Sequence, residues 1–178
     1  LPPTSNNILY IGSMDWLPNE KAVLWFVENV FLEIQKEFPE TKLYIVGKNP
    51  SKKILTLKGD NIIVTGLVDN VVDYINLCSI SIVPIFIGGG MRVKILELMA
   101  AGRAIVSTTI GAEGIIYRNN EDILIADTKE EFFQKIKYLL ESPNKRIDMG
   151  KNARINVQKN YSWKRKVNEY ASYLKKLI

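Results

Sequence analysis

Residues 88–97, GGGMRVKILE, combine features that suit the binding of an anion. The three glycines at positions 88–90 have no side chains, so a ligand can approach the backbone closely there. Arg92 and Lys94 follow with positive charge, and the guanidinium of Arg92 offers bidentate geometry toward a phosphate. If a helix begins near Met91, its first N–H groups have no partners within the helix and favour an anion. The stretch therefore predicts an anion site.

Glu97 adds a carboxylate one to two turns into the expected helix, too deep to cap its start. A carboxylate there can accept hydrogen bonds from two neighbouring hydroxyls, such as those of a ribose. Because its neighbours along the chain are apolar, we expect Glu97 not to face solvent wholly. These neighbours are Ile95, Leu96, Leu98 and Met99. The alternative is a flexible loop followed by an exposed amphipathic helix. The spacing matches neither a P-loop nor a GxGxxG fingerprint.

Composition excludes several kinds of catalytic site. The 178 residues include no histidine, so the chain cannot itself build a Ser-His-Asp triad, a Cys-His pair or a histidine-ligated metal site. The single cysteine, Cys78, precludes an internal disulfide and is expected to be a small buried residue. We expect no metal site, and no apolar run has the length of a membrane span.

The formal net charge of +5 suits an anionic ligand or an acidic membrane surface. The lysines are scattered, so we do not expect nucleic acid as a partner. The alternative, a nucleic-acid partner, rests on the alternating basic and aromatic residues of KNYSWKRK, residues 159–166.

Six short runs rich in β-branched residues alternate with helical stretches. The predicted strands cover residues 8–12, 42–47, 61–66, 79–84, 103–108 and 122–127. Apolar spacing predicts helices over 20–37, over 69–78 with Asp69 as N-cap, and after Thr128 as N-cap. Apolar strands separated by helices indicate a doubly wound, Rossmann-like α/β fold with a parallel sheet of about six strands and C-terminal helices.

The predicted organisation is a linker over residues 1–7, one α/β domain over 8–160 and a C-terminal helix over 161–178. Two helices after Pro143 are expected to break near Tyr161 and Ser162. The first three strands each end in glycine, at the sheet edge where such folds bind ligands. Tight strand-to-helix turns explain Gly47 and Gly66 equally well.

Two residues outside the glycine run are further candidates. Trp16, in the loop after the first strand, is a candidate stacking platform, whereas Trp25 and Phe26 have the helical spacing of core residues. Glu113, after the fifth strand, points toward the ligand edge, where a ligand contact and a turn-stabilising role are both open.

The chain resembles, in order and over essentially its whole length, the C-terminal half of GT-B glycosyltransferases, most closely the retaining group called family 4. The resemblance rests on GSMDWLPN, LYIVGKNP, VTGLVDNVVDYI, VPIFIGGGMRVKILELMAAGRAIVSTTIGAEGI and YSW. It implies the donor-binding half of an enzyme that transfers a hexose-type sugar from a nucleotide to an acceptor hydroxyl, in surface polysaccharide or glycan synthesis.

Position by position, the resemblance assigns roles to eleven residues. Glu97 matches the glutamate that holds the ribose hydroxyls, and Arg92 and Lys94 would stabilise the leaving diphosphate, as catalytic residues, without a metal. The other donor-binding positions are Gly12, Ser13, Lys48, Leu67, Val68, Gly89, Gly90 and Met91. Gly12 and Ser13 approach the phosphates, the turn Gly90–Arg92 faces the diphosphate with its amides, and Lys48, Leu67 and Val68 line the base pocket.

Two departures concern the donor. The first glutamate of the family's pair falls at Gly89, a position that usually helps to hold the donor sugar. The family's frequent arginine after the first glycine is Ser13 here, with Lys21 a loose match for the lysine that follows. Arg92 and Lys94 are expected to take over that charge.

The expected partners are a UDP- or GDP-sugar and an N-terminal acceptor-binding domain outside this chain, and no cofactor is expected. Without that domain, we expect this chain to bind donor but not to turn it over. The expected location is the cytoplasm, including the inner membrane face as a peripheral site. Two alternatives are a nucleotide-sugar epimerase half, which depends on histidine, and a non-catalytic α/β nucleotide-binding or regulatory module. A receiver-like module needs an acidic cluster after the first strand, where IGSMD has one aspartate.

Overall fold

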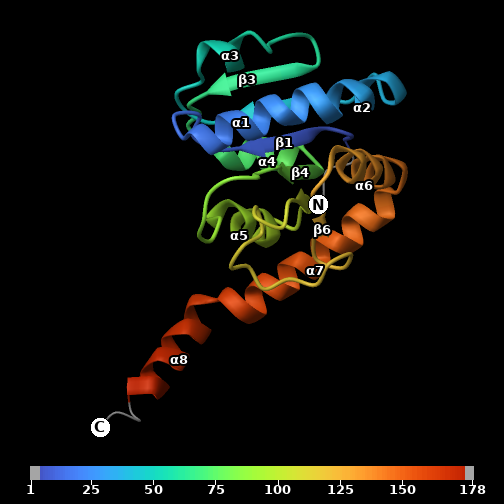
Figure 1. Ribbon diagram of the computed structural model, residues 1–178. Coiled ribbons are helices and arrows are strands. Elements are labelled where there is room, and N and C mark those ends of the chain that lie inside the picture. Colours follow the sequence, from blue (N-terminus) through green and yellow to red (C-terminus); the bar gives the residue numbers. More distant parts are fainter. Residues whose placement is uncertain (1–4, 175–178) are drawn as a thin grey trace.

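The computed structural model describes residues 5–174, and within them six parallel strands form one twisted sheet (Figure 1). The strand order is β3-β2-β1-β4-β5-β6. The strands are β1 (Ile8–Ile11), β2 (Leu43–Val46), β3 (Ile62–Gly66), β4 (Ile80–Val83), β5 (Ala104–Ser107) and β6 (Leu124–Ile125). This is the doubly wound arrangement expected, in which the chain reverses its direction of progress between β1 and β4. The predicted fold class is confirmed.

Helices cover both sides of the sheet and extend beyond it. They are α1 (Leu17–Phe26), the π-helical η1 (Val27–Phe31), α2 (Leu32–Glu37), α3 (Lys52–Leu55), α4 (Val71–Leu77), α5 (Val93–Ala100), α6 (Lys129–Glu141), α7 (Pro143–Tyr161) and α8 (Trp163–Leu174). The α1–η1–α2 helix packs against α6, and α5 packs against α7. In Figure 1, α7 and α8 run diagonally away from the sheet.

The central strands are buried because helices cover them. Every residue of β4 and β5 is buried, including Ser81 and Ser107, as expected for strands covered on both faces. Trp25 packs edge-on against Phe86 and Phe132, and Phe26 is fully buried, so the expected core roles of both α1 aromatics are confirmed. Cys78 is likewise buried, and burial raises the pKa of its thiol to about 12, which makes it unreactive.

Two of three predicted helix starts differ in detail from expectation. The first helix begins at Leu17 and contains a π-helical turn, where apolar spacing alone predicted one regular helix from residue 20. Asp69 is not the N-cap of α4: the side chain of Asn70 accepts the N–H of Val72 instead, because Asn70 has the extended backbone that a cap requires. Thr128 caps α6 as predicted, in a capping box with Glu131.

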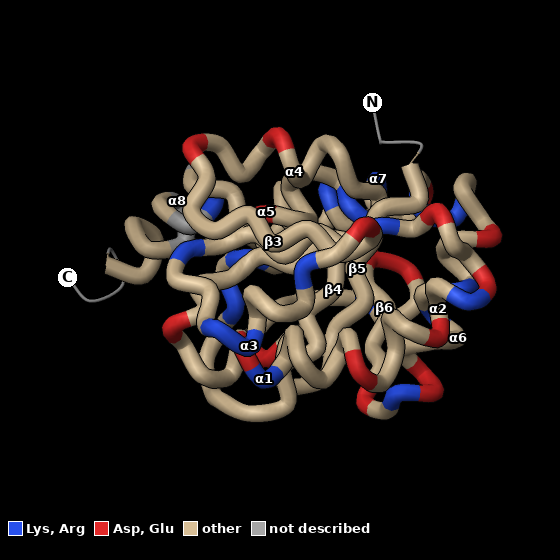
Figure 2. Tube along the Cα trace, turned by 90° about the horizontal axis from the view of Figure 1, so that it is seen from above, with Lys and Arg blue, Asp and Glu red and all other residues tan. Residues whose placement is uncertain are grey.

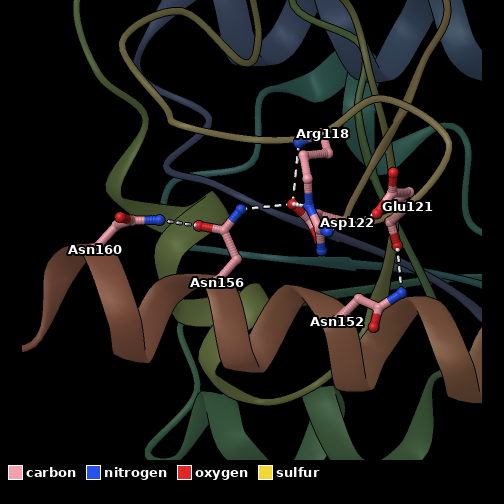
Figure 3. Close-up of polar contacts among 6 residues, drawn as sticks. All are labelled: Arg118, Glu121, Asp122, Asn152, Asn156 and Asn160. Carbon is pink, nitrogen blue, oxygen red and sulfur yellow. Dashed lines mark hydrogen bonds and ion pairs between the residues drawn. The ribbon is translucent and has the colours of Figure 1, made fainter.

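A buried carboxylate joins the β5–β6 connection to α7 (Figure 3). Asp122 is fully buried and accepts hydrogen bonds from the Arg118 side chain and, at 2.5 Å, from Asn156 of α7. Burial alone would raise the pKa of Asp122, but the hydrogen bonds from Arg118 and Asn156 hold it below its ordinary value. Asn160 and Asn152 extend the contact along the same helix face.

The ends of the predicted domain are only partly described. Residues 5–7 lie against the domain, with Ser5 donating to the Leu77 carbonyl and Asn6 accepting from Arg146. The predicted helix break is confirmed, since α7 ends at Tyr161 and α8 begins at Trp163. Residues 1–4 of the predicted linker and 175–178 of the predicted C-terminal helix lie outside the described residues.

Basic and acidic positions are interspersed along the chain (Figure 2). Neither sign gathers on one whole side in that view.

Candidate functional site

Two loops meet where the sheet reverses its strand order. One follows β1 and includes Gly12 and Ser13, and the other follows β4 and includes the glycine run. In doubly wound folds this switch point, at the carboxyl ends of the strands, is where ligands bind. The carboxyl ends of β1 and β2 lie in close contact: a Cβ on Gly47, whose φ is +155°, would come within 1.8 Å of the Gly12 carbonyl oxygen.

Arg92 crosses from the β4 loop to the β1 loop and is only 7% exposed. Its Nη1 donates to the carbonyl oxygens of Gly89 at 2.6 Å and Gly90 at 2.5 Å, and its guanidinium carbon lies 5.2 Å from the centre of the Trp16 ring. Its Nε and Nη2 are buried with no hydrogen-bond partner among the described residues. Nη2 lies beside Gly88, where φ is +112° and a Cβ would come within 3.1 Å of it. Two unpaired guanidinium nitrogens are costly when buried, and an anionic ligand would satisfy their N–H groups.

Lys94 reaches the same place from the first turn of α5. Its Nζ donates to Asn19 Oδ1 at 3.1 Å and lies 4.7 Å from the centre of the Tyr10 ring. Burial, and then the positive charge of Arg92, lower the pKa of Lys94 to about 7. Gly12 leaves room for this contact, because a Cβ there would come within 2.9 Å of Nζ.

Asn19 organises the floor of the site, and sequence reasoning missed it. It is 5% exposed, accepts from the Tyr10 hydroxyl at 2.7 Å, and donates to the Ser13 carbonyl at 2.8 Å. Burial raises the pKa of Tyr10, so its hydroxyl stays a donor. The available signal was a polar residue at the start of a helix whose later inward positions are apolar, a pattern that also fits an exposed helix start.

Glu113 lies against the glycine loop. Its Oε2 accepts the Gly90 N–H at 2.9 Å and would be 3.8 Å from a Cβ on Gly89. The Gly90 amide, expected to face a diphosphate, is therefore held by a carboxylate in this structure. Both roles considered for Glu113 remain compatible, since it stabilises the turn and lines a hollow of about 480 Å³ that Gly88 also borders.

Two expectations for α5 need correction. The helix begins at Val93, with Arg92 at the N-cap position, so Met91 belongs to the loop. Glu97 is exposed, not partly enclosed, because Ile95, Leu98 and Met99 take the inward positions of the helix. The N-terminus of α5 still directly follows the glycine loop. Because Glu97 is exposed, its carboxylate is open to a ligand.

The predicted base-pocket residues lie farther along the sheet. Lys48 is exposed after β2 and has its Nζ 4.0 Å from Asp15 Oδ2, which places it beside the β1 loop. Hydrogen bonds from Ser13 and Asn49 lower the pKa of Asp15, so this carboxylate stays ionised. Leu67, 80% exposed, and Val68 follow β3, the edge strand two places from β1. Among the described residues, no hydrogen bond or ion pair links Leu67 or Val68 to Arg92.

Among the side chains that the structure describes, no group of three or more aspartates, glutamates or cysteines is placed to hold a metal ion. Within residues 5–174, no helix combines the length and apolar character needed to cross a bilayer.

Comparison with known proteins identifies relatives of the chain. The model of a family described as glycosyl transferases group 1 matches residues 5–142. A protein in the cps region of Klebsiella pneumoniae is 28% identical over 169 residues, covering 89% of this chain and 43% of that protein. A glycosyltransferase of Methanocaldococcus jannaschii is 29% identical over 165 residues, covering 85% of this chain and 42% of its own length. The chain thus spans less than half the length of these relatives.

Solved structures share the fold. HepE of Anabaena in complex with UDP and glucose superposes with a TM-score of 0.76 at 13% identity, over 96% of this chain and 48% of HepE. The C-terminal domain of the group 1 glycosyl transferase LpcC of Francisella tularensis superposes with a TM-score of 0.70 at 16% identity, over 88% of this chain and 86% of that domain.

Proposed function

Since this chain belongs to the glycosyl transferases group 1 family, we propose that it is the half of such an enzyme that binds a nucleotide-diphosphate sugar. The observation that carries the proposal is Arg92, whose Nε and Nη2 are buried and unpaired at the switch point of the sheet. A diphosphate oxygen would accept from both nitrogens if the glycine loop shifts to admit it, because neither nitrogen has accessible surface in the free structure. Lys94 and the N-terminus of α5 add positive potential at the same point.

In the proposed reaction the sugar passes to an acceptor hydroxyl with retention of configuration, and the nucleotide diphosphate leaves. Arg92 and Lys94 stabilise the charge that develops on the leaving group, without a metal. The donor is a UDP- or GDP-sugar of hexose type, and HepE, which shares the fold, was solved with UDP and glucose. Glu113, whose carboxylate lies beside Gly89, is proposed to accept hydrogen bonds from the sugar hydroxyls.

A role in surface polysaccharide synthesis is supported by one relative, which is named for the cps region. Acceptor binding is assigned to an N-terminal domain beyond this chain. By itself, this chain would bind donor without turnover. A cytoplasmic location, with peripheral contact at the inner membrane face, stays a prediction.

Calorimetric titration of UDP, GDP and ADP into the chain tests the proposal. Saturable binding of one nucleotide is expected, with the base pocket deciding which. If the folded chain and the longer protein that contains it both fail to bind any of the three, the proposal is wrong.

Replacing Glu97 with glutamine is expected to weaken binding of the preferred nucleotide by about 2 kcal/mol, roughly 30-fold, because charged hydrogen bonds to the ribose hydroxyls are lost. Binding of the 2′,3′-dideoxy analogue should be equal in both proteins, since it offers no hydroxyls to accept. Glu141→Gln, an exposed change on α6, is the matched control. An equal loss for both nucleotides would show that Glu97 does not contact ribose.

Binding of a nucleotide sugar is expected to weaken as the pH rises from 7 to 9, by at most about tenfold per unit. The free protein holds Lys94 with a pKa near 7, and a bound diphosphate favours the charged form and raises that pKa. Binding above pH 7 therefore takes up a proton. The diester diphosphate of a nucleotide sugar does not itself titrate in this range. Calorimetry at pH 6.5, 7.5 and 8.5 measures how the affinity depends on pH, and Lys94→Met should remove this dependence. An equal dependence in both proteins would show that Lys94 is not the group that takes up the proton.

A further inference from the structure

A second buried arginine lies at the opposite ends of the strands from the Arg92 site. Arg103 precedes β5, at the amino ends of the strands, whereas Arg92 lies beyond the carboxyl end of β4. Arg103 is 5% exposed, and its Nη2 donates to Asn76 Oδ1 at 3.1 Å. Its Nε and Nη1 are buried with no hydrogen-bond partner among the described residues. Two nitrogens of a buried cation thus lack acceptors among the described residues, as at Arg92.

Local backbone does not supply the missing acceptors. The carbonyls at the end of α5 are already used: those of Glu97, Leu98 and Met99 accept the N–H groups of residues 101–103. The partial negative charge at this helix end helps Arg103 to stay charged but leaves its N–H groups unpaired. Burial lowers the pKa of Arg103.

Arg103 lines a pocket of about 370 Å³ between α4, the α5–β5 turn and α7. Lys151 and Arg154 of α7 also line it, and none of the acidic side chains that the structure describes does. Among the side chains that the structure describes, neither of these two α7 residues has a carboxylate within 4.0 Å. The pocket is therefore cationic, and its volume is in the range of small-molecule sites.

One wall of the pocket is rigid. A Cβ on Gly150 of α7 would come within 2.0 Å of the Gly102 carbonyl oxygen, so the α5–β5 turn and α7 touch backbone to backbone. This contact fixes the spacing between the backbone segments that carry Arg103 and the two cations of α7.

We infer that this pocket is a second anion site, which takes a phosphate group through Arg103, Lys151 and Arg154. The phosphate belongs either to a lipid headgroup or to a soluble phosphorylated molecule, since both present the same acceptor oxygens. The site is independent of nucleotide binding at Arg92, because it uses other residues at the opposite edge of the sheet.

The test follows backbone amides by NMR while sodium pyrophosphate is added to the ¹⁵N-labelled chain in 0.15 M NaCl. Residue-resolved shifts separate this pocket, at residues 101–103 and 147–154, from the loop at 88–92. The double variant Lys151→Gln/Arg154→Gln changes only exposed side chains, so it should fold. The double variant should bind pyrophosphate at least fivefold more weakly, as measured from the amide shifts in the pocket, and its nucleotide affinity should be unchanged. Lys145→Gln, exposed on the same helix but outside the pocket, should behave as the original protein.

Co-sedimentation with phosphatidic acid vesicles, against phosphatidylcholine vesicles, identifies the source of the phosphate. Loss of vesicle binding in the double variant but not in Lys145→Gln supports a lipid headgroup. Saturable pyrophosphate shifts in the pocket without vesicle binding support a soluble ligand. If the double variant alters neither, or if pyrophosphate shifts spread evenly over the basic surface, the inference is overturned.

Discussion

Replacing Arg92 with glutamine is expected to weaken binding of the preferred nucleotide diphosphate by about 3 kcal/mol, roughly 100-fold. The change removes the two buried nitrogens proposed to donate to the diphosphate, together with the charge. Arg92→Lys keeps a charge but lacks the planar fork, so it should show an intermediate loss of about tenfold. Calorimetric titration of the three proteins measures the effect.

The same substitution should not lower thermal stability. Arg92 in the free protein is a buried cation with unpaired N–H groups, and removing such a group is neutral or stabilising even though two hydrogen bonds to glycine carbonyls are lost. Weaker binding with an unchanged or higher Tm is therefore the signature of a ligand site. A Tm that falls in step with binding would show that Arg92 is structural. Lys58→Gln, exposed and outside the site, controls for the change of charge.

Replacing Gly47 with alanine is expected to cost about 4 kcal/mol of unfolding free energy and to lower Tm by roughly 10 °C. The new Cβ would lie 1.8 Å from the Gly12 carbonyl oxygen, and the φ of +155° is one that residues with side chains rarely adopt. The strand ends of β1 and β2 must separate to relieve the clash. Nucleotide affinity should fall as well, because the β1 loop that meets Arg92 moves with Gly12.

Gly59→Ala is the matched control, since a Cβ at Gly59 would have no atom within 4 Å. Circular dichroism melts of both variants measure stability, and calorimetry measures binding. Equal melting temperatures for the two variants would contradict the close packing of β1 on β2.

The order of elements was predictable from the sequence because each element carries its own period. Mostly apolar runs such as ISIV of β4, with one serine, are typical of strands in a sheet covered on both faces, and their alternation with helical spacing favours a parallel arrangement. Thr128 was recognisable as a cap because its glutamate partner lies three residues away. Where two polar residues compete, as Asp69 and Asn70 do, local sequence does not decide which has the extended backbone of a cap.

Residue types also predicted that 88–97 is an anion site, since glycines followed by an arginine and a lysine have few other uses at the end of a buried strand. The exposure of Glu97 was not predictable from its apolar neighbours, because the rotation of α5 depends on how Ile95, Leu98 and Met99 fit against the core.

Tertiary structure alone decided which residues meet. Asn19 joins Lys94 across 75 positions of sequence, and Glu113 holds the Gly90 amide from a loop 23 residues away. Such contacts depend on strand order, and β1 neighbours β4 only because the sheet reverses direction there. Local composition determined what each segment can become and what chemistry it can offer. The packing of distant strands determined that Arg92 is buried beside Trp16, with its Nε and Nη2 unpaired among the described residues.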